Sequence, residues 1–278
     1  DSLLTILVSS PYLYKLKLSV LQIVVYVIIY VNINFIRRYY MSFKDRIVSP
    51  DSLVNQQGVK ILVYGAAGAG KTTLCGTAPG RKLMIDMESG LLSVRDSQDI
   101  DVIQVKEAKE IIEICEALKN GELVYDTVCL DSISEMSEIL LNFEKARHKD
   151  PRMAYGNVQE TCTNVMRAYR DLHMHVVFVS KMEKMNVDNV MQYEPKMVGT
   201  KLGQSITYFF DEVLALRVIE EQDDEGALVK NRWLQTDVGQ GYTAKDRSGK
   251  LDGFEVPNLT SVIDKLGFKT QVIGGNDE

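Results

Sequence analysis

Short apolar runs alternate with amphipathic stretches along most of the chain, and together they predict an α/β fold. Continuous apolar runs are typical of buried parallel strands, and apolar residues at three- and four-residue spacing are typical of helices. The runs predict strands at Lys60–Tyr64, Lys82–Asp86, Thr127–Asp131, Val176–Ser180 and Glu212–Val218, with later strands near Arg232–Thr236 and Gly241–Lys245. The helical pattern occupies Lys106–Lys119, Ile133–Lys145 and Val158–Leu172. This alternation predicts a mostly parallel sheet with helices on both faces and ligands at the carboxyl ends of its strands.

A glycine-rich stretch follows the first predicted strand and leads into a helix start. Its sequence is Gly65-Ala66-Ala67-Gly68-Ala69-Gly70-Lys71-Thr72, which fits the phosphate-loop pattern G-x-x-x-x-G-K-[ST]. Glycines let successive backbone N–H groups point into one concavity, and a helix N-terminus adds partial positive charge there. We therefore assign ATP binding to this stretch and to Thr73, with Lys71 on the β- and γ-phosphates and the Thr72 hydroxyl on Mg²⁺. The alternative is a glycine-rich strand-to-helix turn without a ligand.

The first forty residues differ from the rest of the chain. Leu18 to Ile36 is almost continuously apolar between basic flanks, which is the pattern of a marginal membrane anchor. The soluble, domain-like sequence from Met41 and the abundance of Ile, Tyr, Asn, Leu and Lys before it favour translated upstream sequence instead. We set residues 1–40 aside, expect no stable membrane association, and assign residues 41–273 to one domain and residues 274–278 to a polar tail.

The net charge and the cysteine content limit the partners and the cellular compartment that we expect. The formal net charge of the whole chain is −6, and leaving out the basic first forty residues makes the remainder more acidic. An acidic body argues against indiscriminate nucleic-acid binding but leaves room for a local basic groove. The four cysteines show no C-x-x-C spacing, which favours a reducing, cytoplasmic setting.

Two acidic residues at predicted strand ends are candidates for the chemistry of hydrolysis. Asp131 ends an apolar strand, where its carboxylate can hold Mg²⁺ as a Walker B acid does; the alternative is a cap for the following helix. Ser132 follows it, so a glutamate that activates water is missing from the place it has in typical AAA+ ATPases. Glu88, at the end of the second strand, is the candidate for the base that polarises the attacking water. The alternative for Glu88 is an exposed loop glutamate.

Two cations near the far end of the chain have the spacing Lys-x-Arg. Lys245 and Arg247 would share one face of a strand, where they can reach a phosphate together. The alternative is an ordinary solvated strand face, and the spacing alone does not decide between the two.

Residues 58 to 268 resemble the phage-encoded RecA-like nucleotide-binding proteins, a family that includes single-strand annealing recombinases. The resemblance is carried by the phosphate loop, by Ile85-Asp86-Met87-Glu88, by Tyr125 to Ser132 and by Ala244-Lys245-Asp246-Arg247. It implies a RecA-like P-loop core in which one strand separates the Walker B strand from the phosphate-loop strand. It also implies that Glu88 is the catalytic glutamate and that Lys245 and Arg247 complete a neighbouring subunit's ATP site. Ser180 falls at the γ-phosphate-sensing position, where relatives often carry Gln or His.

The same resemblance implies two DNA-binding loops, around residues 147–152 and 181–201. Both contain basic residues with aromatic company, from Tyr155 and Tyr193, as backbone tracking and base stacking on single strands require. The alternative is a pair of mobile surface loops with solvated lysines. The resulting hypothesis is an oligomeric, Mg²⁺-dependent ATPase, forming a ring or filament, that acts on single-stranded DNA in the cytoplasm of a phage's host.

Two other functions remain open from the sequence. One is a nucleotide-regulated binding or scaffold protein without DNA activity. The other is a small-molecule P-loop kinase, which is disfavoured because the region between the fourth and fifth strands contains lysines and no arginine.

Overall fold

The strands of a computed structural model follow the predicted alternation along the chain. The model describes residues 27, 47–222 and 226–268. The segment set aside at residues 1–40, apart from Val27, and the tail at 274–278 lie outside the described residues. Within the described ranges, no helix combines the length and the apolar character that crossing a membrane requires.

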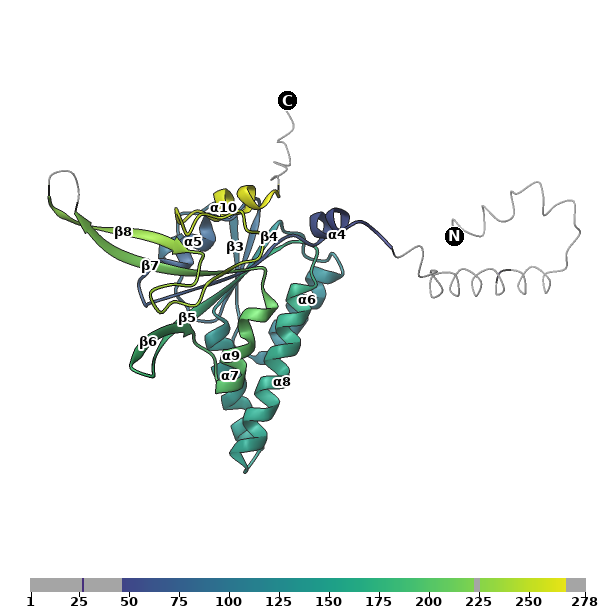
Figure 1. Ribbon diagram of the computed structural model, residues 1–278. Helices are drawn as coiled ribbons and strands as arrows, with labels where there is room; N and C mark the ends of the chain where they lie inside the picture. Colours follow the sequence, from purple (N-terminus) through teal and green to yellow (C-terminus); the bar gives the residue numbers. More distant parts are fainter. Residues whose placement is uncertain (1–26, 28–46, 223–225, 269–278) are drawn as a thin grey trace, which may run out of the picture. The chain divides into compact units, whose positions relative to one another are not determined.

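Ten strands of the described residues form one sheet (Figure 1). Its parallel part has the order β3-β2-β4-β5-β1-β7. These strands are β1 (Lys60–Gly65), β2 (Lys82–Asp86), β3 (Ile100–Gln104), β4 (Thr127–Asp131), β5 (His175–Val187) and β7 (Glu212–Gln222). Four further strands pair antiparallel: β6 (Val190–Pro195) with β5, β8 (Leu228–Gln235) and β9 (Lys245–Asp246) with β7, and β10 (Phe254–Glu255) with β8.

The order of the central strands is that of a RecA-like P-loop NTPase. β5 lies between β1, which leads into the phosphate loop, and β4, which ends in Asp131. Phe178 of β5 is in register with Leu62 on one side and Leu130 on the other. The predicted separation of the two nucleotide strands by one inserted strand is therefore confirmed, and so is the predicted fold class.

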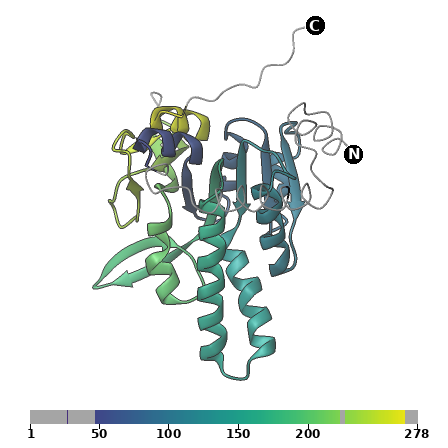
Figure 2. The ribbon, with the colours of Figure 1, turned by 90° about the vertical axis from the view of Figure 1, so that its right-hand side faces the viewer.

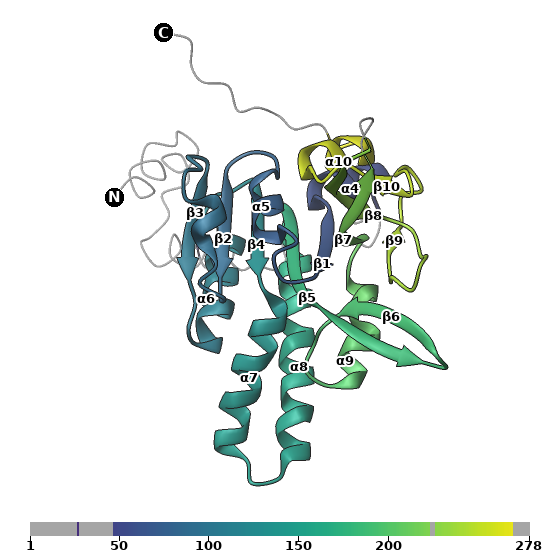
Figure 3. The same ribbon diagram turned by 90° about the vertical axis from the view of Figure 1, so that its left-hand side faces the viewer.

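Helices cover both faces of the sheet, which buries every residue of β1. Leu62 packs with α6 (Ala108–Lys119), α7 (Ile133–Arg147) and α8 (Pro151–Arg170), whereas Ile61 and Val63 pack with α5 (Lys71–Gly76) and α10 (Leu259–Leu266). Figures 2 and 3 show α7 and α8 running side by side and extending beyond the sheet as a helical hairpin. The remaining described helices are α4 (Pro50–Gln57), η2 (Leu91–Val94), α9 (Thr200–Ser205) and η3 (Ile206–Phe209).

The segments expected to form two loops are largely regular structure. Residues 147–152 span the end of α7 and the start of α8, which begins at Pro151 rather than at the predicted Val158 because Asp150 caps it by accepting a hydrogen bond from the Arg152 N–H. The segment from residue 181 onward is mainly a β-hairpin, because β5 continues past Ser180 and returns as β6. Asp188 and Asn189 form its turn with φ values of 52° and 64°, as a type I′ hairpin requires.

The last predicted strand is shorter than expected. The run Gly241–Lys245 forms strand only from Lys245, as the two-residue β9. Gly241 lies at φ 80°, and Tyr242 instead bridges to Tyr193 of β6. This connection ties the base of the β5–β6 hairpin to the segment that follows β8.

Candidate nucleotide-binding site

The phosphate loop turns sharply between β1 and α5, and the turn uses the glycines. Gly68 and Gly70 have φ values of 73° and 102°, in the left-handed region that side-chain-bearing residues rarely adopt. Gly70 is also the N-cap of α5, so the unpaired N–H groups at the helix start face the loop's concavity. The local sequence therefore builds an anion-binding loop at the carboxyl edge of the sheet.

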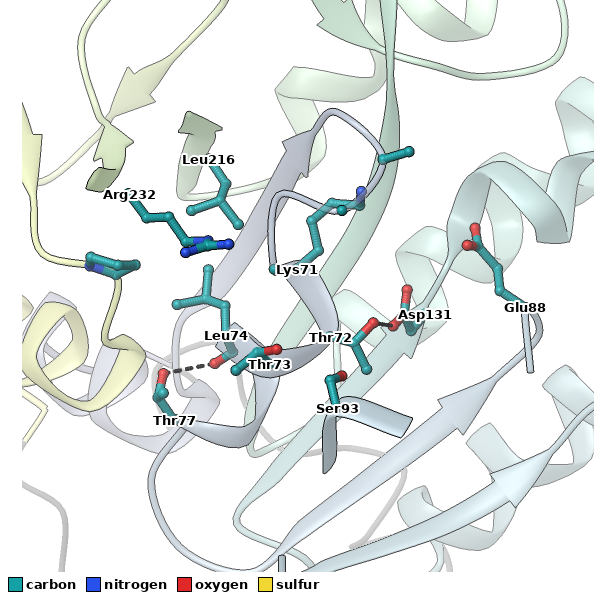
Figure 4. A pocket seen from close by; sticks show the side chains of 14 residues that line it. Lys71, Thr72, Thr73, Leu74, Thr77, Glu88, Ser93, Asp131, Leu216 and Arg232 are labelled. Atoms are coloured by element: carbon teal, nitrogen blue, oxygen red, sulfur yellow. Dashed lines mark hydrogen bonds between the residues drawn. The ribbon is translucent and has the colours of Figure 1, made fainter. Parts of the chain in front are cut away.

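A cavity of about 650 Å³ opens beside this loop (Figure 4). Segments remote in sequence contribute to it, because the carboxyl ends of parallel strands meet at one edge. The residues that line it are Ala67, Gly68, Gly70, Lys71, Thr72, Thr73, Leu74, Thr77, Glu88, Ser93, Asp131, Leu216, Arg232 and Pro257. The cavity thus brings together Lys71, Thr72, Thr73, Glu88 and Asp131 of the predicted site.

Lys71 folds back over the loop. Its Nζ donates hydrogen bonds of 3.0 Å to the backbone carbonyls of Gly65 and Ala66. Burial lowers the pKa of Lys71, and the negative charges of Asp131 and Glu88 oppose this shift. The ammonium group therefore lies within the loop's own curve, where an anion bound to the backbone N–H groups would meet it.

Thr72 and Asp131 offer oxygen ligands to a divalent cation. The Thr72 Oγ1 donates a 2.6 Å hydrogen bond to Asp131 Oδ2, drawn as a dashed line in Figure 4. Burial raises the pKa of Asp131, while the bond from Thr72 lowers it. Both side chains suit Mg²⁺, which is usually held by one or two protein oxygens together with substrate phosphates. Within the described ranges, no cluster of three or more His, Cys, Asp or Glu side chains offers another metal site.

The helix-cap alternative for Asp131 does not match the geometry. The N-cap of α7 is Ser132, whose side chain accepts the Glu135 N–H at 3.3 Å. The Asp131 carboxylate points instead to Thr72 and the cavity.

Glu88 is presented to the cavity by a turn that Asp86 holds. Buried Asp86 accepts the backbone N–H groups of Glu88 and Ser89 at 3.1 and 2.9 Å. The Glu88 carboxylate accepts a hydrogen bond from the Ser132 hydroxyl, and Lys181 Nζ lies 3.6 Å from it. Two polar neighbours therefore orient the carboxylate beside Asp131.

Lys181, which sequence reasoning grouped with a DNA-binding loop, contacts the acids of this edge. It forms an ion pair with Glu135 at 2.6 Å and approaches Glu88. Burial disfavours its charge, but the hydrogen bond to Glu135 and the charge of Glu88 outweigh that cost, so the pKa of Lys181 is raised. The register of Lys181 with Gly65 places it at the level of the phosphate loop, a signal that the sequence pattern alone does not carry.

Ser180 faces the other way, because successive strand residues point to opposite faces. It is fully buried, its Oγ lies 3.0 Å from the Ser134 Oγ, and it donates to the Lys196 carbonyl at 3.2 Å. Ser180 does not line the cavity. No contact of Ser180 with the cavity therefore supports its predicted role in sensing the γ-phosphate.

Lys245 and Arg247 lie at the opposite, amino edge of the sheet. β9 pairs with the first two residues of β7, which are level with the start of β1 rather than with the phosphate loop. Lys245 Nζ donates to the carbonyls of Thr207 and Phe210 at 2.9 and 2.6 Å, and Arg247 pairs with Asp211 at 2.8 Å. Burial and the charge of Arg247 lower the pKa of Lys245. The two cations are therefore close together but remote from their own chain's cavity.

Arg232 of β8 is a cavity residue that the motifs did not indicate. Its Nε donates a 3.0 Å hydrogen bond to the carbonyl of Ala69. The sequence held one indirect signal, since Arg232 lies two residues before the buried Leu234 and therefore on the same strand face. Finding it required the antiparallel register of β8 on β7.

One comparison with known proteins identifies a family for the chain. A search of curated protein sequences gave no significant match. Among solved structures, the chain is similar to a KaiC-like protein, PH0186, from the hyperthermophilic archaeon Pyrococcus horikoshii OT3, with 12% identity, a TM-score of 0.38, and coverage of 68% of this chain and 89% of that chain. A protein family described as an AAA domain matches residues 57–248, well over half of the chain. The chain belongs to this AAA domain family, and its described core is a P-loop ATPase domain.

Proposed function

We propose that the protein binds ATP with Mg²⁺ and hydrolyses it, using Glu88 as general base. The observation that carries this proposal is the convergence of Lys71, Thr72, Asp131 and Glu88 on one cavity. Thr72 and Asp131 would hold the metal ion, which neutralises phosphate charge when bound. Lys71 would bind the β- and γ-phosphates beside the backbone N–H groups of the loop.

Glu88 is the group that supports turnover rather than binding alone. In the proposed step its carboxylate takes a proton from water, the water oxygen bonds to the γ-phosphorus, and the bond to the ADP oxygen breaks. The Ser132 hydroxyl and the Lys181 ammonium hold the carboxylate in place. A serine after Asp131 therefore serves here as an orienting partner of the base.

The proposed macromolecular substrate is single-stranded DNA, in recombination or annealing. The end of the α7–α8 hairpin supports this, because it carries basic and aromatic side chains in contact. Arg147 lies 5.0 Å from the ring of Phe143, and Lys145 lies 5.9 Å from the ring of Tyr155. Phe143 is 50% and Tyr155 43% exposed, so both rings are accessible to a base.

The β5–β6 hairpin carries a second set of such side chains. Lys184 lies 5.8 Å from the ring of Tyr193, and Val187, Val190 and Met191 are exposed near the turn. Both hairpins extend from the same side of the sheet in Figure 3. We further propose that several subunits assemble, as a ring or filament, and align these hairpins along one strand of DNA.

The test is the ATPase rate with and without single-stranded DNA, together with the salt dependence of DNA binding. We expect DNA to stimulate hydrolysis and the affinity for DNA to fall steeply with salt. The triple variant Arg147→Ala, Lys149→Ala, Lys184→Ala should flatten the salt slope. The matched control replaces Lys106, Lys109 and Lys119, three exposed lysines in and before α6, with Ala and should leave the slope unchanged.

Failure of the DNA part is distinguishable from failure of the ATPase part. Hydrolysis without any DNA binding at low salt would favour a nucleotide-regulated scaffold protein. Absence of ATP binding by the wild-type protein would overturn the whole proposal.

A further inference from the structure

Arg232 lies where the β7–β8 hairpin leaves the body of the sheet. β8 pairs with β7 so that Arg232 is opposite Val218 and Leu234 opposite Leu216. Leu234 and Leu216 are buried in the cluster that contains α5 and α10. Arg232 continues this row on the same strand face, one step farther out, and reaches the phosphate loop where the apolar packing ends (Figure 4).

Contacts with the loop hold the guanidinium in place. The Nε donates to the Ala69 carbonyl at 3.0 Å, and a Cβ built on Gly70 would lie only 3.5 Å from the same nitrogen. Arg232 is thus packed against the two residues that immediately precede Lys71. Figure 4 shows Arg232 on one side of Lys71, with Asp131 and Glu88 on the other.

The rest of the guanidinium is available for a ligand. Its neighbours on β8 are paired within the hairpin: Lys230 with Glu220 at 3.3 Å, and Asn231 with Glu221. In the parts of the chain that the structure describes, the only acceptor recorded for Arg232 is the Ala69 carbonyl, which takes Nε. The side chain is exposed and lines the cavity. Its two terminal nitrogens therefore remain as donors in a fixed planar fork.

We propose that Arg232 binds the phosphate chain of the nucleotide as a second cation, supplied by the same chain that supplies Lys71. The inference rests on the proposed ATP binding and adds a residue to it. A guanidinium held against a loop of backbone N–H donors meets the same oxygens that those donors bind, and a bidentate contact to phosphate suits its geometry. Contact with the nucleoside is the competing arrangement, because Leu216 and Pro257 line the cavity as well.

Binding of ATP and of inorganic tripolyphosphate, each with Mg²⁺, separates the two arrangements. Arg232→Gln should weaken both ligands by a similar factor, about tenfold or more, because each loses a charge-assisted hydrogen bond to phosphate. Lys230→Gln, two residues away on the same strand, is the matched control and should leave both affinities unchanged. Isothermal titration measures the affinity of the wild type and of both variants for each ligand.

Arg232→Lys tests whether the side chain acts through its charge or only by bracing the loop. If it binds phosphate, lysine should recover part of the affinity for both ligands. If it serves only to brace Ala69, lysine should fail as glutamine does, and the inference is overturned. Loss of affinity for ATP alone would place Arg232 at the nucleoside and would also overturn it. Unchanged affinities in Arg232→Gln, with normal ATP binding by the wild type, would remove Arg232 while leaving the proposed function intact.

Discussion

The two edges of the parallel sheet both carry cationic side chains, but in different surroundings. At the carboxyl edge, Lys71 and Arg232 line a cavity that also contains the acids of the site. At the amino edge, Lys60 is buried and donates to the carbonyls of Leu172 and Met174 at 3.0 and 2.7 Å, and burial lowers its pKa to about 8. Lys245 donates to backbone carbonyls in the same way.

The polarity of the helices explains this difference. A helix that precedes a parallel strand ends near the strand's amino edge, where its last carbonyl groups lack partners. Leu172 and Met174 follow α8, and Thr207 lies in η3, before β7. Lysines at this edge satisfy the protein's own carbonyls. Helix N-termini such as that of α5 gather at the carboxyl edge, where the unpaired groups are donors and anions are needed.

The largest expected effect comes from mutating one lysine at each edge of the sheet and comparing the two variants. Lys71→Ala should abolish measurable ATP binding, because its charge serves the phosphates. The melting temperature should change little, because one of the two loop carbonyls that Lys71 contacts, that of Ala66, is exposed to water. Lys245→Ala should lower the melting temperature and leave the ATP affinity of the isolated chain unchanged, because its ammonium serves two carbonyls. Nucleotide titration and thermal unfolding of both variants provide the measurement. Equal loss of ATP affinity in both would break the distinction.

Arg247 provides a second test of the difference between the two edges. The Lys-x-Arg pair is proposed to act on the ATP site of a neighbouring subunit. If Arg247 acts there, Arg247→Ala should lower the rate of hydrolysis about 10³-fold. A mixture with inactive Lys71→Ala should regain activity, because some interfaces would then pair an intact loop with an intact arginine.

Asp211→Asn is the matched control for Arg247. It removes the ion-pair partner and keeps the cation, so it should keep its activity. If mixed oligomers form but stay inactive, Arg247 does not act on a neighbouring subunit, and its role is the ion pair with Asp211.

Glu88→Gln tests whether Glu88, among the residues at the carboxyl edge, is the general base. Binding of ATP should persist while turnover falls about 10²-fold or more, because the amide cannot take a proton from water. Glu138→Gln is the control and should keep the parental rate, since Glu138 pairs with Lys196 and does not line the cavity. Hydrolysis at the parental rate in Glu88→Gln would end the role of Glu88 as base.

The smallest effect concerns Glu212, a buried acid at the amino edge. Burial and the nearby charge of Asp246 raise the pKa of Glu212 to about 8, so the folded protein holds its proton where an unfolded chain releases it. Its contribution to the free energy of unfolding therefore falls as the pH rises from about 4.5 to about 8. The melting temperature of Glu212→Gln should therefore rise relative to that of the wild type as the pH increases across that range. A difference independent of pH would show that Glu212 does not titrate there.

Much of the fold was predictable because the central strands are strongly apolar and the phosphate loop is a specific motif. The boundaries of β1, β2 and β4 match the predictions within one residue. Strand β3 is absent from the prediction, because three of its five residues are exposed and its pattern is weak. The hairpin after Ser180 is a further difference from the prediction, because Asp188-Asn189 lacks the glycine that marks most two-residue hairpin turns.

The residues of the candidate site also fall into two groups, those that a local motif indicates and those that it does not. Local sequence indicated Lys71, Thr72, Asp131 and Glu88, since each belongs to a motif at a strand end. Lys181 and Arg232 have no motif, and their positions follow from strand register: Lys181 opposite Gly65, and Arg232 opposite Val218. Register depends on pairing between distant segments, which composition and periodicity do not encode.

The continuous strand β5 has a consequence for hydrogen exchange. Its 13 residues extend for about 40 Å: Val176 to Val179 pair on both sides, with β1 and β4, and the residues beyond Lys181 pair with β6. Amide protons of the inner part should exchange only when the whole domain unfolds, whereas those beyond Lys181 should exchange through opening of the hairpin. One strand would therefore display two classes of protection, and the boundary between them falls at the residue that contacts Glu88.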